Sequence, residues 1–207
     1  MQNHTGIRGI VVVSFALALS WGGNARAAGQ CWAGDPSKVT LEWTAYKFTE
    51  KKGVKAKFTK VAIKGPTKGK SVLNILKAST FKVDASSIDT GDKGRDTNIY
   101  TAFLQKLAGD IHGGFNVSGG KGKDVAKVEL RLNFNGKSQV IPLQYALSGD
   151  GNLELTGAMD VLKFGADAAM ESLKAACKTQ HTGSDGKSVT WSTVDFRISA
   201  AFTKTDC

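Results

Sequence analysis

The side chains that could bind a metal or act as a nucleophile are few and far apart in this sequence. After residue 27 the histidines are His112 and His181, and two such distant residues make a poor metal site. His181 has Ser184 and Asp185 beside it, but these three are too close in sequence to form a catalytic triad. The motifs HExxH, GxSxG and the P-loop are absent. We therefore expect no enzymatic activity, no catalytic cofactor and no metal site.

The first 27 residues have the pattern of a secretory signal peptide. Arg8 supplies a positive charge, the run Ile10 to Leu19 is apolar, and Ala25-Arg26-Ala27 is a small-x-small cleavage site. The apolar run is too short to span a bilayer as a permanent helix. We expect cleavage near residue 27 and a mature protein that is periplasmic or secreted.

Export changes the expected chemistry of the three cysteines. In an oxidising compartment, two of Cys31, Cys177 and Cys207 would form a disulfide and one thiol would be left over. We favour Cys31 with Cys177, which would tie the amino terminus to a predicted helix. Cys207 is the alternative partner, because connectivity cannot be deduced from spacing.

The elements that position these residues are predicted to be mainly antiparallel strands. Val128, Leu130, Leu132 and Phe134 alternate with polar residues, and Asn135-Gly136 then supplies a tight hairpin turn. The returning strand and a third strand complete a meander across residues 125–155. Further strands are expected over residues 39–48, 54–64 with a bulge between Phe58 and Val61, 71–77, 79–88, 109–119 and 189–202.

Two segments have helical periodicity instead. From Asp96 onward, Ile99, Phe103 and Leu107 recur at i, i+4 and i+8. Residues 161–177 carry a second apolar stripe. We therefore predict one all-β domain with two short helices, residues 28–207, in which eight or nine strands avoid exposed edges by closing. The expected architecture is a closed antiparallel eight-stranded barrel, which can hold a small ligand between its walls.

Two stretches resemble signature segments of the YceI-like family. One is the run Trp43 to Phe48 followed by Gly53-Val54 and Phe58, and the other is the run Ser86 to Gly91 followed by Arg95-Asp96. The resemblance covers roughly residues 38–202. It implies an exported, lipocalin-like barrel whose elongated lumen holds a polyisoprenoid chain, such as an isoprenoid quinone or a lipid carrier.

An apolar lumen would bind such a chain by removing apolar surface from water, at about 25 cal/mol per Å² before ordering costs. Helical residues that could close one end of the barrel are Phe103, Leu107, Phe164 and Met170. The full set of candidate lining residues is Trp43, Phe48, Phe58, Phe81, Ile88, Phe103, Leu107, Phe134, Phe164 and Met170.

Arg95 is a further candidate ligand-binding residue, because it lies where a polar loop meets the first predicted helix. It could contact a polar head group at the mouth of the barrel. Alternatively, Asp96 caps the helix and Arg95 pairs with Asp89 or Asp92. The residues alone leave both interpretations open.

Positive charge is concentrated in a lysine-rich segment, residues 47–82. This segment holds eleven lysines and one acid, Glu50, for a net charge of +10, whereas residues 28–207 as a whole carry 26 basic and 18 acidic side chains. A field of this sign attracts anions and anionic membrane surfaces. The alternative is that the lysines only form a solvated outer face.

Two functions therefore compete. The first is an exported protein that holds a polyisoprenoid or isoprenoid quinone for carriage, storage or stress tolerance. The second is an interaction protein with a filled barrel, which binds an anionic partner or membrane surface through residues 47–82. Nucleic acid is not an expected partner, because export separates the chain from it and few aromatics lie among the lysines. The oligomeric state stays open, with a homodimer among the assemblies allowed.

Overall fold

The computed structural model describes residues 1, 29–119 and 126–207, so the predicted signal peptide lies outside the described residues apart from Met1. These residues form mostly antiparallel strands with three α-helices. The helices are α1 (Val72–Lys77), α2 (Lys93–Ala102) and α3 (Asp167–Ala176). The strands are β1 (Gln30–Gly34), β2 (Thr40–Lys47), β3 (Lys52–Phe58), β4 (Val61–Lys64), β5 (Lys68–Gly69), β6 (Thr80–Val83), β7 (Ile88–Asp89), β8 (Ile111–Ser118), β9 (Lys127–Phe134), β10 (Lys137–Leu147), β11 (Asn152–Asp160) and β12 (Thr190–Asp206).

The predicted central meander is confirmed. β9 and β10 pair antiparallel from Lys137 opposite Phe134, and β10 continues into β11. Asn135 and Gly136 both have positive φ, at 51° and 69°, as a two-residue hairpin turn of this type requires. Along β9 every second side chain is buried, so the alternation of apolar and polar residues in the sequence arises because one face of this strand packs on the core.

The sheet is a curled, open one, and the prediction of a closed eight-stranded barrel is wrong. Its strands follow the order β4-β6-β8-β9-β10-β11-β12-β2-β3-β7, with β1 and β5 attached beside β12. In the described residues the two edge strands, β4 and β7, do not pair with each other. The count is also larger than predicted, because the predicted strands over residues 54–64 and 79–88 each divide into two and because β1 and β5 were not predicted.

The reason for the open edge lies at the expected bulge between Phe58 and Val61. The chain breaks there into two strands: β3 pairs with β2 at one edge, and β4 pairs with β6 at the other. Several hydrogen bonds of residues 59 and 60 cross this seam: the Thr59 amide donates to the Ser87 carbonyl at 3.0 Å, the Lys60 amide donates to Ser87 Oγ at 3.0 Å, and the Asp84 amide donates to the Lys60 carbonyl at 3.1 Å. The seam is thus held by a few hydrogen bonds around a turn, not by a strand ladder.

Residues 71–77, expected to be a strand, instead form helix α1. Ser71 caps the helix by accepting a hydrogen bond from the Asn74 amide at 3.1 Å. Val72, Ile75 and Leu76 are buried together on one face. The spacing 72, 75, 76 is helical, but the same segment also reads as alternating when Leu73 is counted.

The two predicted helices are present with shifted bounds. α2 begins at Lys93, after the cap Asp92, and ends at Ala102, so it is shorter at its far end than the periodicity indicated. In the second segment, Gly165 adopts a left-handed conformation and separates a 3₁₀ turn, residues 161–164, from α3. No helix in the described part of the chain is long and apolar enough to cross a membrane.

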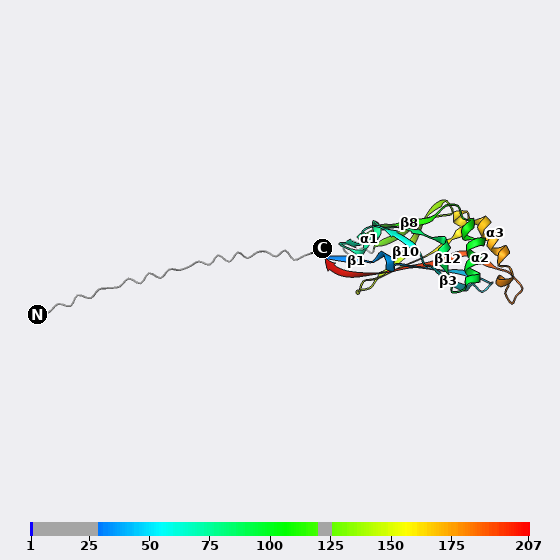
Figure 1. Cartoon of the computed structure of the whole chain (residues 1–207), viewed down its shortest axis with the longest axis horizontal. Coiled ribbons are helices and arrows are strands. Elements are labelled where there is room, and N and C mark those ends of the chain that lie inside the picture. Colours follow the sequence, from blue (N-terminus) through cyan, green and yellow to red (C-terminus); the bar gives the residue numbers. More distant parts are fainter. Residues whose placement is uncertain (2–28, 120–125) are drawn as a thin grey trace.

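The molecule is elongated, and its two ends are closed by different elements (Figure 1). At one end, here called the disulfide end, β1, β5 and α1 lie beside the carboxyl terminus. At the other, here called the helix end, α2 and α3 lie against each other. Two clusters of buried side chains follow this division, one around Phe134 toward the helix end and one around Leu155 toward the disulfide end.

The disulfide joins Cys31 to Cys207, so the favoured pairing of Cys31 with Cys177 is wrong and the alternative partner is the observed one. β1 pairs with the last residues of β12, Gln30 opposite Asp206, and this register brings the two cysteines to a Cα–Cα distance of 5.0 Å. Cys177, at the end of α3, is a buried free thiol.

Candidate functional site

A cavity of about 140 Å³ lies inside the curled sheet toward the helix end. Its walls come from both edges and the centre of the sheet, and α2, α3 and the turn after α2 cover it. Nearly every lining side chain is apolar, Thr190 and the indole nitrogens of Trp43 and Trp191 being the exceptions. Such a surface binds by excluding water and by dispersion, and it offers no group suited to proton transfer.

Six of the predicted lining residues are brought together around this helix-end cavity. They come from β2, β3, β6, β9, the end of α2 and α3, and are Trp43, Phe58, Phe81, Phe103, Phe134 and Met170. Phe103 and Met170 therefore cover the cavity from the helices, as expected for residues that close an end. Within the described residues, the buried indole N–H of Trp43 has no hydrogen-bond partner.

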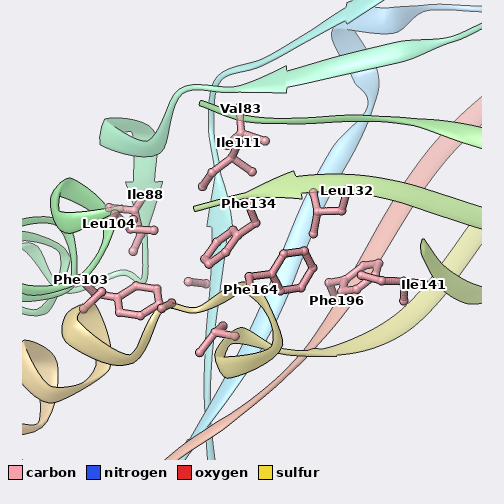
Figure 2. Packing of buried hydrophobic residues seen from close by; sticks show 14 of the residues in the cluster. Val83, Ile88, Phe103, Leu104, Ile111, Leu132, Phe134, Ile141, Phe164 and Phe196 are labelled. Atoms are coloured by element: carbon pink, nitrogen blue, oxygen red, sulfur yellow. The ribbon is translucent and has the colours of Figure 1, made fainter. Parts of the chain in front are cut away.

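The aromatic rings form a continuous wall on one side of this cavity. The Phe103 and Phe134 ring centroids are 6.2 Å apart, and Phe134 meets Phe164 edge-on at 5.5 Å (Figure 2). Edge-on contacts of this kind add about 0.5–1.5 kcal/mol beyond the burial of area.

A second apolar cavity, of about 90 Å³, lies toward the disulfide end. Of the residues that line this cavity, Phe81 alone was predicted from the sequence. Ile75 and Leu76 of α1 were missed because that segment was predicted to be a strand. Phe202 was missed although it continues the period-two pattern of β12.

The two cavities meet at a waist formed by Leu41, Phe81 and Ile198, which line both of them. An engineered apolar cavity of about 150 Å³ stays dry and accepts one benzene molecule. The helix-end cavity, at about 140 Å³, is therefore matched to a group of about that size, and the disulfide-end cavity, at about 90 Å³, to a smaller one. A longer apolar chain needs both cavities, and it must widen the waist between them.

The family follows from the comparison with known proteins. A model of the YceI-like domain matches residues 32–203. The chain belongs to the YceI-like family. Among curated protein sequences, none matches the chain at a significant level.

Two solved structures share the YceI-like fold of this chain. BcnA from Burkholderia cenocepacia is 13% identical, with a TM-score of 0.54 over 82% of this chain and 99% of BcnA. A polyisoprenoid binding domain from Saccharophagus degradans, implicated in plant cell wall breakdown, is also 13% identical, with a TM-score of 0.54 over 84% of this chain and 98% of the domain. At this level of identity the likeness concerns the fold alone.

The loop that resembles the YceI-like signature is organised around the buried carboxylate of Asp96. Asp96 accepts hydrogen bonds from the Thr90 amide at 2.8 Å and the Thr90 hydroxyl at 2.7 Å, and only 7% of its surface is exposed. Burial raises the pKa of Asp96, but the hydrogen bonds from Thr90 and the nearby Lys93 outweigh this and hold it below its usual value. The carboxylate therefore stabilises the loop in its charged form.

Arg95 contacts residues of the same YceI-like loop and lies outside the cavity lining. Its Nε donates to Thr90 Oγ1 at 3.1 Å, and its guanidinium is 3.8 Å from the Asp92 carboxylate. Asp92, not Asp96, caps α2 by accepting from the Arg95 amide. The head-group role for Arg95 therefore has no support in the geometry, and the pairing with Asp92 is observed.

Four other predicted lining residues also lie outside the cavity lining in the described structure. Leu107 follows a 3₁₀ turn that ends the helical periodicity, so it no longer shares a face with Phe103. Ile88 and Phe164 are buried in the core, with Phe164 behind Phe134. Phe48 is in a turn with φ of 62°, where its carbonyl accepts a hydrogen bond from the Trp191 indole.

Cys177 and His181 lie at the helix end, and Lys47 is close enough to affect both. Burial raises the pKa of the Cys177 thiol, and Lys47 opposes that rise. Burial lowers the pKa of His181, and Lys47 lowers it further; the ring contacts Thr190 Oγ1 at 2.5 Å. In residues 29–119 and 126–207, no three His, Cys, Asp or Glu side chains gather as a metal site.

Proposed function

We propose that this YceI-like protein binds a long apolar chain, a polyisoprenoid or an isoprenoid quinone, along the two cavities. The observation that carries the proposal is the shared waist: Leu41, Phe81 and Ile198 line both cavities, so an apolar chain that displaces these side chains would run through both. An isoprenoid chain is a matching ligand, since its repeating five-carbon units can thread such a path. Carriage, storage or stress tolerance would each use this binding.

The energetics favour a long ligand over a short one. Each buried apolar Å² contributes about 25 cal/mol, from which the cost of ordering the chain is subtracted. A ligand confined to the helix-end cavity gains only the area of one small group. A chain that continues into the disulfide-end cavity gains more area after the cost of association has already been met.

We also propose that the mature protein works outside the cytoplasm, after cleavage near residue 27. The Cys31–Cys207 disulfide supports this location, since such bonds persist in oxidising compartments. The competing function, an interaction protein with a filled interior, is less well supported because two apolar cavities occupy that interior.

The test is to measure, by native mass spectrometry, how the affinity for isoprenoid alcohols depends on their chain length, from geraniol to octaprenol. We expect affinity to rise with length until both cavities are filled. Leu41→Trp should fill the waist and weaken octaprenol binding by about tenfold or more, which is about 1.4 kcal/mol. Geraniol, which needs only one cavity, should lose less affinity, although Leu41 lines both cavities. Affinity that does not depend on chain length would overturn the proposal.

The control is Leu147→Trp, in which a half-buried leucine of β10 that lines neither cavity receives the same ring. Overpacking can cost about 1–3 kcal/mol of stability at either position. Because both variants carry this cost, a loss of octaprenol binding confined to Leu41→Trp separates a blocked waist from a general loss of stability.

A further inference from the structure

The helix end carries a basic surface that the cavities alone do not explain. The turn between β2 and β3 lies against residues 178–191: the Phe48 amide donates to the Val189 carbonyl at 3.0 Å, and Thr49 Oγ1 donates to Asp185 at 2.7 Å. Two segments far apart in the sequence thus form one surface. Its lysines, here called the basic rim, are Lys47, Lys51, Lys52, Lys178 and Lys187.

The charge of the basic rim is poorly neutralised. Residues 47–52 and 178–191 contain five lysines against two acids, Glu50 and Asp185. Among the described residues none of the five lysines forms an ion pair, and all but the half-buried Lys47 are exposed. Other lysines of the lysine-rich segment are paired instead, such as Lys57 with Asp89 at 3.6 Å and Lys82 with Asp110 at 2.7 Å.

Aromatic side chains lie among these lysines and connect the basic rim to the cavity. Lys51 Nζ is 4.4 Å from the Trp191 ring centroid, and Trp191 lines the helix-end cavity. Lys47 Nζ is 4.6 Å from the Phe48 ring centroid and donates to the Gln180 carbonyl at 3.1 Å. Trp beside Lys is the combination found at membrane–water interfaces, where the ring enters the head-group layer and the ammonium group stays hydrated.

The cavity also comes near the surface on this side. Ile99, Leu173 and Trp191 line it and are each only half-buried. A lipid that leaves a bilayer would therefore meet apolar side chains beside the positive charge. At the disulfide end, by contrast, the Cys31–Cys207 bond holds the chain closed.

We propose that the basic rim docks this protein onto anionic lipid bilayers, so that the helix-end cavity exchanges its isoprenoid directly with the membrane. The proposal rests on the isoprenoid-binding function given above and names the surface at which loading occurs. Positive charge supplies attraction to anionic head groups, and Trp191 supplies the contact that continues into the cavity. Docking therefore orients the protein as well as concentrating it.

The test is flotation of the mature protein, residues 28–207, with vesicles of phosphatidylcholine alone or mixed with phosphatidylglycerol. Binding should require phosphatidylglycerol and should weaken as salt rises, because the interaction is screened within a Debye length. In K51Q/K52Q/K187Q, vesicle affinity should fall roughly 10- to 100-fold, given the contribution of each lysine near an anionic surface.

The matched control is K68Q/K70Q/K77Q, which removes the same charge from exposed lysines at the disulfide end. It should retain nearly all vesicle binding. An equal loss in both triple variants would overturn the proposal, because binding would then follow net charge and not the basic rim. Binding that ignores phosphatidylglycerol would overturn it as well.

Octaprenol uptake from dilute detergent, measured without vesicles, distinguishes this proposal from the underlying function. The K51Q/K52Q/K187Q variant should take up octaprenol as the unmodified protein does. If the unmodified protein takes up octaprenol but fails to float with anionic vesicles, only the docking proposal fails. If it takes up none, the isoprenoid-binding function itself fails.

Discussion

The disulfide end and the helix end close the same curled sheet by different means. At the disulfide end, β1 adds to β12 over five residue pairs, and the Cys31–Cys207 bond locks that addition. At the helix end, two ten-residue helices lie over the cavity, and no covalent link among the described residues holds them to the sheet. Both closures bury apolar side chains, but only one of them is cross-linked.

This difference indicates where the molecule opens. Proteins open locally at regions with few buried contacts and no cross-link, at a free-energy cost below that of global unfolding. Ile99 and Leu173, from the two helices, are only half-buried where they line the cavity. We therefore expect ligand to enter at the helix end, while the disulfide end keeps the sheet in register.

The largest expected effect comes from removing the cross-link. C31A/C207A should lower the free energy of unfolding by about 3–5 kcal/mol, because the bond closes a loop of 176 residues in the unfolded chain. Urea denaturation under oxidising conditions measures this loss. C177A, which removes the free thiol at the helix end, should lower the free energy of unfolding much less. A similar loss in both variants would contradict the conclusion that the two ends are stabilised by different means.

A smaller effect is expected from the loop that precedes α2 at the helix end. D96N should lower the free energy of unfolding by about 1.5–3 kcal/mol near pH 7, because the buried carboxylate accepts two hydrogen bonds from Thr90. The folded-state pKa of Asp96 is depressed, so its contribution is present above the unfolded value of about 3.9 and is lost as pH falls through the folded value. Denaturation curves of D96N and the unmodified protein should therefore converge in acid, and a gap that persists there would contradict this assignment.

The smallest effect concerns a helix cap at the disulfide end. S71A removes the side chain that accepts the Asn74 amide, and should cost about 1 kcal/mol. If the disulfide end unfolds only with the whole sheet, S71A should reduce amide protection in β1 and β9 equally by hydrogen exchange. Faster exchange confined to α1 would show instead that this end also opens locally.

Short-range patterns in the sequence predicted the parts of the fold that depend on them. The β9–β10 hairpin follows from strict alternation and from Asn135-Gly136. Of the six predicted residues that line the helix-end cavity, four are large apolar side chains on strands and two, Phe103 and Met170, come from the helical segments. Helix α1 was mistaken for a strand because Val72, Leu73, Ile75 and Leu76 fit both periods. Leu107 was placed wrongly because a periodic pattern does not report the turn that ends α2.

The pairing of strands and cysteines that are far apart in the chain could not be predicted from the sequence. The choice between Cys177 and Cys207 depends on β1 meeting the far end of β12, and no local pattern near Cys31 encodes that register. The open edge has the same cause, because the break after Phe58 sends β4 to the opposite side of the sheet. The shared waist likewise needs strands that are distant in the chain to be placed together.

The position of β12 has a consequence for how the protein is made. β12 lies between β11 and β2, so the sheet cannot be completed until residues 190–206 have been synthesised. Cys177 also emerges before Cys207, which makes it the first partner that Cys31 can encounter. If Cys31 paired with Cys177 first, that bond would have to be exchanged before Cys31 could pair with Cys207. Burial of Cys177 in the finished fold then prevents the wrong bond from returning.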